Sequence, residues 1–361
     1  MAVNKISAKE LQRLVDAVQP VDSALEEQAR VHLDNLTKPL GSLGRLEDLA
    51  AKMYVASGGI APQADPARIY TIAGDHGVNE EDVSYFPQEV TRQMVENFLD
   101  GGAGINVLAR TSGVELLVVD AGCKGGPFPE HPNLIQRRIG CGTANISKGP
   151  AMNGECCRQA VALGFELADE AHAQGIKVLG TGEMGVSNTT PSTALYCAYF
   201  DLDPADITGP GGGIDSEGVR RKTDVIRCAL AANAEVVRSA DPFAILTALG
   251  GYEIAALAGL ILGGAKNKQM VCIDGFISTA AYAAAVKICP AVSGYCVLSH
   301  ASAEPGYAKV IKALGRRPLL HLDMRLGEGS GAALSMFMLR AAANIFNEMA
   351  TFDDAGVHAG G

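Results

Sequence analysis

The sequence lacks any clustered run of basic side chains. Its 30 lysines and arginines are outnumbered by 40 aspartates and glutamates, which gives a formal net charge of −10. A protein that binds nucleic acid needs a concentrated basic surface to neutralise phosphates, so we expect no nucleic-acid partner. An anionic small molecule is compatible with this charge, because backbone N–H groups at helix N-termini bind phosphate without net positive charge.

Long apolar segments and paired cysteines are also missing. The longest apolar stretch, residues 254–262, is too short to span a bilayer, and residues 1–20 lack the apolar core of a secretory signal. The nine cysteines form no Cys-x-x-Cys pair and show no zinc-site spacing. We therefore expect a cytoplasmic protein with free thiols, no membrane contact and no metal site.

Two common nucleotide-binding motifs are absent as well. No Walker loop and no strand–GxGxxG–helix unit occurs in the sequence. A glycine-rich loop at 209–215 precedes a helix expected to begin near Ser216, an arrangement that lets a phosphate approach backbone amides. Lys222 lies about two turns into that helix, where it either reaches a phosphate or is an ordinary solvated lysine.

Short apolar segments rich in β-branched residues alternate with longer segments of helical periodicity. This alternation predicts an α/β fold, with a Rossmann-like parallel sheet of about six strands and helices on both faces. Helices are expected near 88–109, 155–174, 217–237, 279–287 and 306–313. Strands are expected at 68–73, 115–119, 177–179, 270–273, 295–298 and 319–322.

The two ends of the chain are helical in pattern. Three amphipathic segments open the sequence at 8–18, 22–35 and 43–56, and a long helix is expected at 332–349. We expect residues 1–60 and 332–361 to form a small helical domain together. Residues 61–331 are expected to form the large α/β domain.

Nearly every expected strand runs directly into a polar, glycine-containing loop. Ligands of open α/β sheets bind outside the carboxyl ends of the strands, so we expect these loops to converge on a single cleft. Glycines also close ordinary turns, and one such loop alone would carry little weight. The set of loops favours a functional cleft; its members are residues 74–77, 120–122, 180–185, 274–275, 299–306 and 325–331.

Two glutamates stand between glycines in these loops. Glu183 and Glu328 would be partly desolvated there, which raises the pKa of a carboxyl group and suits it to general-base catalysis. The alternative is that each caps a helix or pairs with an arginine such as Arg325. Asp75 and His76 are a poor metal signal without further ligands at suitable spacing, and we expect a hydrogen-bonded pair that shapes their loop.

Uncommon strings of residues occur along almost the whole chain. They are LTKPLGSLG at 36–44, GDHGV at 74–78, PQEVT at 87–91, GEMG at 182–185 with NTT at 188–190, DGFI at 274–277, SAEPG at 302–306 and LGEGSG at 326–331. In content and order these strings closely resemble the nicotinate-nucleotide:5,6-dimethylbenzimidazole phosphoribosyltransferases of cobalamin biosynthesis.

This resemblance implies a fold, a reaction and a set of site residues. Members of the family are homodimers with a Rossmann-type sheet, and they transfer phosphoribose from nicotinate mononucleotide to a small aromatic base without metal or cofactor. By the resemblance, Glu328 matches the catalytic base and Glu183 a second carboxylate near the ribose. The incoming base is expected to contact Ser84, Tyr85, Phe86, Gln88 and Leu326. The phosphate and ribose are expected to contact Gly182, Gly185, Val186, Ser187, Asn188, Thr189, Gly211, Gly212, Gly213, Lys222, Ser302, Ala303, Glu304 and Gly306.

Two positions depart from the family pattern. Tyr307 follows the SAEPG string where the family carries histidine, and Gly212 stands in the glycine loop where the family carries threonine. We expect Tyr307 to alter how its loop meets the nucleotide. Gly212 is expected to leave phosphate binding to backbone amides.

These departures leave the incoming base open. One alternative to a benzimidazole or purine is phenol or p-cresol, joined through an O-glycosidic bond in relatives that resemble hetero-oligomers of two related subunits. Another is that the chain is a non-catalytic nucleotide-binding subunit of such an assembly, although the presence of both Glu183 and Glu328 counts against it. A nicotinamide-linked dehydrogenase would rest on the parallel sheet and glycine loops alone.

Overall fold

The computed structural model describes residues 5–358 of the chain. Residues 1–4 and 359–361, which belong to the expected small helical domain, lie outside the described part. None of the helices in the described part is long and apolar enough to cross a membrane.

Six parallel strands form one sheet in the order β3-β2-β1-β4-β5-β6. This is the order of a Rossmann-type doubly wound sheet, in which the direction of winding reverses between β1 and β4. The predicted α/β class and the predicted number of strands are confirmed. The strands are β1 (Ala67–Gly74), β2 (Glu115–Gly122), β3 (Leu134–Gln136), β4 (Val178–Met184), β5 (Met270–Ile273) and β6 (Cys296–Leu298).

One member of the expected set of strands is wrong. Residues 319–322 form no strand, because only Leu320 bridges to His300 and the segment then turns into solvent, where Leu322 is 51% exposed. The sixth strand is instead β3, a three-residue edge strand beside β2. Its short, half-buried sequence carries too few residues for a pattern of period two to be recognised.

Several expected helices differ in extent. The segment 88–109 divides into α4 (Glu89–Leu99) and α5 (Gly104–Ser112), because Gly101 adopts a left-handed conformation with φ +77°. The segment 217–237 divides at Asn233. The helices that open and close the chain, and those that match expected segments, are α1 (Ala8–Asp16), α2 (Ala24–Asp34), α3 (Arg45–Ala56), α6 (Gly154–Ala173), α9 (Ser216–Ala232), α10 (Ala234–Ser239), α13 (Phe276–Ile288), α14 (Tyr307–Leu314), α15 (Ser330–Glu348) and α16 (Phe352–Ala355).

Other helices were not expected. They are α7 (Thr189–Phe200), α8 (Pro204–Ile207), α11 (Pro242–Leu249) and α12 (Tyr252–Lys266), with short 3-10 helices at η1 (Gly77–Glu81) and η2 (Pro290–Gly294). Helix α12 is buried on every side up to Ala265. A helix that is apolar all round has no polar face, so its periodicity does not reveal it.

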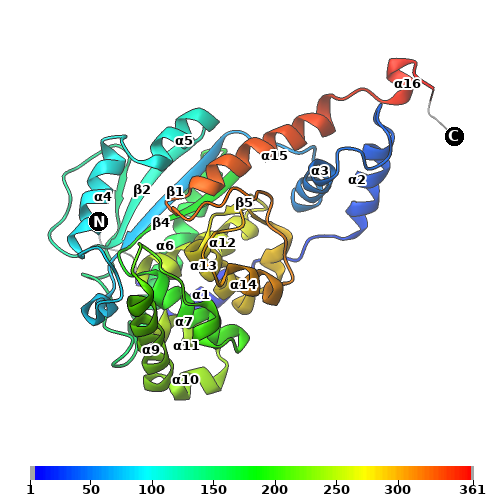
Figure 1. The fold of residues 1–361 in the computed structure, drawn as a ribbon. Coiled ribbons are helices and arrows are strands. Elements are labelled where there is room, and N and C mark those ends of the chain that lie inside the picture. Colours follow the sequence, from blue (N-terminus) through cyan, green and yellow to red (C-terminus); the bar gives the residue numbers. More distant parts are fainter. Residues whose placement is uncertain (1–4, 359–361) are drawn as a thin grey trace.

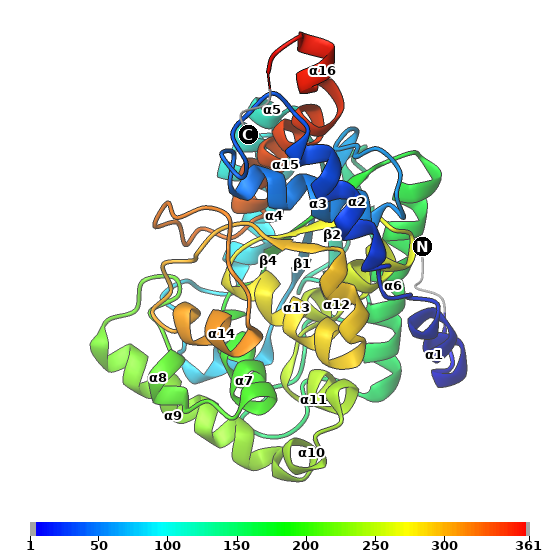
Figure 2. The same ribbon diagram turned by 90° about the vertical axis from the view of Figure 1, so that its right-hand side faces the viewer.

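Both faces of the sheet are covered by helices (Figures 1 and 2). On β1, the Tyr70 hydroxyl donates a hydrogen bond to the Leu167 carbonyl of α6, at 3.1 Å. The neighbouring Ile69 lies near Gly329 and Gly180, and Gly180 in turn lies against Met336 of α15. Because successive side chains of a strand point to opposite faces, α6 and α15 cover opposite sides of the sheet.

The expected division into two domains stays a prediction. Helices α2 and α3 pack together, α3 packs on α15, and Figure 1 shows both beside the C-terminal half of α15. Helix α15 also packs on β4 and β5, whereas α1 packs on α6 and α12.

Helices α6 and α12 cross at two glycines. A Cβ atom added to Gly164 would lie 2.1 Å from the Ala256 carbonyl oxygen, and one added to Gly259 would lie 1.9 Å from the Val161 carbonyl oxygen. The two backbones are therefore in direct contact, and no side-chain movement can relieve an added methyl group.

We predict that Gly164→Ala lowers the free energy of unfolding by about 1–3 kcal/mol, the usual cost of overpacking. Alanine stabilises a helix by about 1 kcal/mol over glycine, so the steric clash must cost more free energy than this gain. Urea unfolding followed by far-UV circular dichroism measures the change. Gly126→Ala is the matched control, because its Cβ would meet nothing within 4 Å; equal stability of the two variants would contradict the close crossing.

Candidate active site

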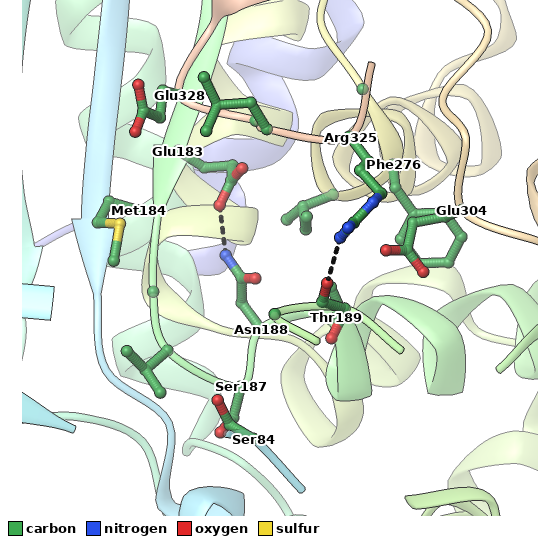
Figure 3. Close-up of a pocket in the computed structure, with 18 of the residues that line it drawn as sticks. Ser84, Glu183, Met184, Ser187, Asn188, Thr189, Phe276, Glu304, Arg325 and Glu328 are labelled. Atoms are coloured by element: carbon green, nitrogen blue, oxygen red, sulfur yellow. Dashed lines mark hydrogen bonds between the residues drawn. The ribbon is translucent and has the colours of Figure 1, made fainter. Parts of the chain in front are cut away.

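A cavity of about 370 Å³ opens at the carboxyl ends of β4, β5 and β6 (Figure 3). Its walls come from the loops after these strands, from residues 83–94 after β1, and from residues 325–328 before α15. The cavity thus lies at the point where the winding of the sheet reverses, which is where open α/β sheets bind their ligands.

The expected convergence of all six polar loops is partly wrong. The loops at 74–77 and 120–122 do not line the cavity. Instead, the loop after β1 contacts the segment that follows β2. The Asp75 carboxylate accepts a hydrogen bond from the Lys124 backbone N–H at 2.6 Å. His76 pairs with Glu253 at 2.7 Å rather than with Asp75. The chain after β1 reaches the cavity only beyond η1.

Most of the residues expected at the site do line the cavity. Those that do not are Gly182, Gly213, Lys222, Ala303, Gly306, Tyr85 and Gln88. Those that do are Glu183, Gly185, Val186, Ser187, Asn188, Thr189, Gly211, Gly212, Ser302, Glu304, Ser84, Phe86, Leu326 and Glu328. Further lining residues belong to the polar loops expected at the cleft, among them Met184, Gly275, His300 and Gly327. Lining residues outside both the expected site set and these loops include Val83, Val90, Met94, Phe276 and Ile277.

Some of the residues outside the cavity support it. A Cβ on Gly182 would lie 2.3 Å from the Glu328 carbonyl oxygen, so this glycine allows close packing rather than contact with a ligand. Gly306 packs on Ile207 in the same way. The Gln88 amide donates to the His76 carbonyl, at 3.1 Å. Tyr85 is 73% exposed.

Glu328 is held in a backbone conformation that side chains rarely adopt. Its φ is +64°, between Gly327 at +82° and Gly329 at +99°. The Thr71 hydroxyl donates to its carbonyl oxygen at 2.7 Å, and the Ile105 N–H at the start of α5 donates to its Oε2 at 3.1 Å. Burial raises the pKa of the Glu328 carboxyl, and the Ile105 N–H partly offsets this. A group of this kind accepts a proton readily.

The alternatives for Glu328 are resolved by its partners. Glu328 does sit at a helix N-terminus, because Ile105 belongs to the first turn of α5. Arg325 does not pair with it, and the Arg325 guanidinium instead donates to the Gly211 carbonyl at 3.2 Å.

Glu183 lies inside β4 and faces residues 327–328. A Cβ added to Gly327 would come within 2.3 Å of its Oε1. The Asn188 side-chain amide donates a hydrogen bond to its other oxygen. Burial raises the pKa of Glu183 to about 8, the Asn188 hydrogen bond opposes the rise, and the charges of Asp274 and other nearby carboxylates add to it. At neutral pH this carboxyl is mostly protonated and can donate a hydrogen bond.

A helix N-terminus and a buried lysine lie together at a second corner of the cavity, an arrangement that favours an anion. Helix α7 begins here, and its N-terminus carries Asn188 and Thr189 at the cavity wall. Lys222 is buried, and its Nζ donates to Thr189 Oγ1 at 2.6 Å and to the Gly209 carbonyl at 3.2 Å. Burial lowers the pKa of Lys222 to about 8. The solvated alternative for this lysine is therefore wrong.

The helix after the glycine loop does not present a free N-terminus to the cavity. Helix α9 begins at Ser216, but its own Asp215 side chain accepts from Gly218 N–H at 2.8 Å and closes that end. The first part of the glycine loop reaches the cavity through Gly211 and Gly212, whereas Gly213 does not line it. The helix N-terminus that faces the cavity belongs to α7, which periodicity did not reveal.

One wall of the cavity is apolar. It is formed by Val83, Phe86, Val90, Met94 and Met184, with Val90 and Met94 one turn apart on α4. Such a wall suits an aromatic ring, since sulfur and aliphatic groups pack well against ring faces.

The two residues that depart from the family pattern, Gly212 and Tyr307, lie in different surroundings. A Cβ on Gly212 would lie 3.1 Å from the Phe86 ring, so the glycine leaves room for that ring. Tyr307 is 2% exposed, forms a hydrogen bond with Thr279 Oγ1 at 3.2 Å, and does not line the cavity. Any effect of Tyr307 on the cavity is therefore indirect, and the expectation that it alters how its loop meets the nucleotide stays a prediction.

The raised pKa of Glu183 predicts a pH-dependent stability. Between about pH 4.5 and 8 the folded chain keeps a proton that the unfolded chain releases, so this residue's contribution falls as pH rises through that window. Glu183→Gln removes the effect. Relative to the wild-type protein, we expect the free energy of unfolding of this variant to rise between pH 5 and pH 8, by an amount on the order of a few kcal/mol. Melting curves at both pH values should show this as a relative rise in the melting temperature of the variant. Parallel melting curves at both pH values would contradict the burial of an ionisable Glu183.

Relatives of this chain are found among known proteins. The family model described as phosphoribosyltransferase matches residues 18–357. The nicotinate-nucleotide–dimethylbenzimidazole phosphoribosyltransferase of Nitratidesulfovibrio vulgaris is 65% identical over 349 residues, which cover 96% of this chain and 98% of that protein. The protein of the same name from Pelodictyon phaeoclathratiforme is 51% identical, with coverage of 97% and 98%.

Solved structures agree with these relatives. The crystal structure of nicotinate-nucleotide–dimethylbenzimidazole phosphoribosyltransferase from Thermus thermophilus superposes with a TM-score of 0.88 at 42% identity, covering 94% of this chain and 100% of that chain. The resemblance seen in the sequence is confirmed. The chain belongs to the nicotinate-nucleotide–dimethylbenzimidazole phosphoribosyltransferase family.

Proposed function

We propose that the chain transfers phosphoribose from nicotinate mononucleotide to a benzimidazole-type base. The products are an α-ribotide and nicotinate, as required for assembly of the lower ligand of a cobamide. The observation that carries the proposal is the arrangement of the cavity, in which Glu183 and Glu328 lie between an apolar wall and an anion-binding corner.

The phosphate is proposed to bind at the N-terminus of α7. Backbone amides there and in the glycine loop donate to its oxygens, and the buried Lys222 supplies positive charge through Thr189. Glu304 faces the cavity beside Gly209, where a carboxylate suits a ribose hydroxyl better than a phosphate. The substrate is then fixed with its C1′ atom toward the two glutamates, which converts the transfer into a reaction between aligned groups.

The reaction has one bond broken and one formed. The C1′–N bond to nicotinate breaks with its electron pair moving to the pyridine nitrogen, which was cationic and becomes neutral. The ribose ring gains oxocarbenium character, and the acceptor nitrogen attacks C1′ from the opposite face. A β-linkage thus becomes an α-linkage, and Glu328 takes the N–H proton of the acceptor, a contribution of roughly 10²–10⁴-fold.

The two glutamates have different proposed roles. With its pKa near 8, Glu183 carries a proton at neutral pH, which favours a role in orienting the ribose by hydrogen bonding. The Glu328 pKa is raised less strongly, because the Ile105 N–H and the N-terminus of α5 favour its anion. Carboxyl groups of one cleft whose surroundings raise their pKa values to different extents are typical of paired acid and base residues.

The assembly and compartment are further parts of the proposal. We propose a homodimer whose partner covers the cavity mouth, where Phe86 and Leu326 are 44% and 56% exposed. All nine cysteines are free thiols, which supports a reducing compartment such as the cytoplasm. Light scattering on the purified protein measures the oligomeric state.

The deciding experiment is an assay with two acceptors. Purified protein is incubated with nicotinate mononucleotide and either 5,6-dimethylbenzimidazole or phenol, and products are identified by mass spectrometry. We expect the benzimidazole α-ribotide, and we expect Glu328→Gln to lower kcat by about 10²–10⁴-fold while nucleotide binding persists. A phenolic riboside phosphate as sole product would place the chain in the phenol-activating branch. Nucleotide binding without either product would support the alternative of a non-catalytic partner subunit.

A second prediction concerns the phosphate corner. Lys222→Met removes the buried charge beside Thr189, and we expect the Kd for nicotinate mononucleotide to rise about 10- to 100-fold, as for the loss of a charge-assisted hydrogen bond. Binding of nicotinate riboside, which has no phosphate, should change far less. Lys309→Met is the control, because this lysine forms a half-exposed pair with Asp206. An equal loss for nucleotide and riboside would contradict the proposed phosphate site.

A further inference from the structure

Asp274 follows β5 directly and lies behind the cavity wall. It is 1% exposed and does not line the cavity. Its Oδ2 accepts from the Gly329 N–H at 3.1 Å, and its Oδ1 accepts from the N–H groups of Gly331 and Ala332 at 2.7 and 3.2 Å. Asp274 therefore closes the N-terminus of α15 from another part of the fold, where Gly329 has no side chain to do so.

The residue next to this contact is Glu328. A non-glycine residue in the left-handed region costs about 1–2 kcal/mol, so its neighbours must hold it there. One of these contacts is the hydrogen bond that the Thr71 hydroxyl donates to the Glu328 carbonyl. The other is the hydrogen bond that Asp274 accepts from the N–H of Gly329, the residue that follows Glu328. The two anchors come from β1 and from the end of β5, on either side of β4.

The surrounding glycines make these contacts possible. A Cβ on Gly331 would lie 2.9 Å from Asp274 Oδ1, so a side chain there would displace the carboxylate. A Cβ on Gly182 would meet the Glu328 carbonyl oxygen at 2.3 Å. The chain is thus shaped to bring Asp274 and the Glu328 turn together.

Helix capping alone does not account for an aspartate here. An exposed or half-exposed serine or asparagine caps a helix nearly as well, whereas a buried carboxylate costs several kcal/mol to desolvate. The histidine that faces it, His300, is a cation only when protonated, and its Nε2 lies 3.8 Å from Oδ1. The other titratable groups around this region include Glu183, Glu253, Glu328 and Tyr307, all acidic. Burial raises the pKa of Asp274, whereas His300 and the backbone N–H groups of Gly329, Gly331 and Ala332 lower it.

We propose that Asp274 is a positioning residue for the reaction, which holds the backbone of residues 328–329 so that the Glu328 carboxylate points at the acceptor proton. The inference rests on the proposed transfer reaction. Asp274 touches neither substrate and acts through Glu328. Its charge also bears on Glu328, because it helps to raise the pKa of that carboxyl.

The test is Asp274→Asn in the full-length chain, assayed with nicotinate mononucleotide and 5,6-dimethylbenzimidazole. Asparagine keeps the shape but replaces one acceptor oxygen with an N–H₂ group that opposes the backbone donors. We expect kcat to fall about 100-fold, as for a small misplacement of a catalytic group, while the Kd for the nucleotide stays within about threefold. We also expect the acid limb of the kcat profile to move to lower pH, because removal of the Asp274 charge lowers the pKa of Glu328.

A matched control separates positioning from capping. Asp241 caps α11 by accepting from Phe243 and Ala244 N–H groups at 2.9 and 3.2 Å, far in sequence from the catalytic residues. Asp241→Asn should lower the melting temperature and leave kcat and its pH profile unchanged. If Asp274→Asn behaves like this control, with unchanged kcat and pH profile, its role is structural and the proposal is overturned.

If Asp274→Asn does not fold, a second variant tests the same proposal. Thr71→Val removes the other anchor of the Glu328 backbone without changing charge. We expect a lower kcat with an unshifted acid limb, and an unchanged kcat would overturn the proposal. Absence of product from the unchanged protein would instead contradict the proposed function itself, so the two failures are distinguishable.

Discussion

The site depends on one strained turn that is held from several sides. Gly327, Glu328 and Gly329 all have positive φ values, and such a run exists only where the surrounding structure stabilises it. The hydroxyl of Thr71 and the carboxylate of Asp274 fix the backbone of this turn, and the Ile105 N–H of α5 holds the Glu328 carboxylate. Because these contacts come from β1, from the end of β5 and from a separate helix, the turn requires the complete sheet.

Burial gives the two glutamates their chemical properties. Each has lost most of its water, and each keeps a limited number of hydrogen-bond donors: the Asn188 amide for Glu183 and the Ile105 N–H for Glu328. Desolvation disfavours the charged form of both, and the nearby negative charges strengthen the effect on Glu183. Desolvation therefore raises the pKa of both carboxyls, and that of Glu183 rises to about 8, so that this carboxyl is mostly protonated at neutral pH.

The order of the strands determines where this chemistry can occur. Winding reverses between β1 and β4, so the connections leaving these strands cover opposite faces of the sheet and leave a gap at their carboxyl ends. Helix α7 follows β4 at this gap and presents its N-terminus, while the segment after β1 returns to supply the apolar wall. The gap therefore has an apolar wall on one side and a helix N-terminus on the other.

The sequence by itself determined the fold class, the family and the two carboxylates. Alternating segments predicted the parallel sheet, and long strings of family residues located Glu183 and Glu328 because they are local in sequence. The sequence did not reveal α7 and α12, since both helices are buried on almost every side and carry no periodic polar face. It also misassigned residues 319–322, because partly exposed leucines resemble a strand in composition.

Other features were decided only by tertiary structure. The helix N-terminus at the cavity is that of α7, whereas Asp215 closes the start of α9 with its own side chain. Tyr307 proved to be buried away from the cavity, and Asp274 proved to contact the Glu328 turn. Asp274 and Gly329 are 55 positions apart in the chain. Hydrogen bonds over such a separation depend on strand order and burial, which no local pattern of residues encodes.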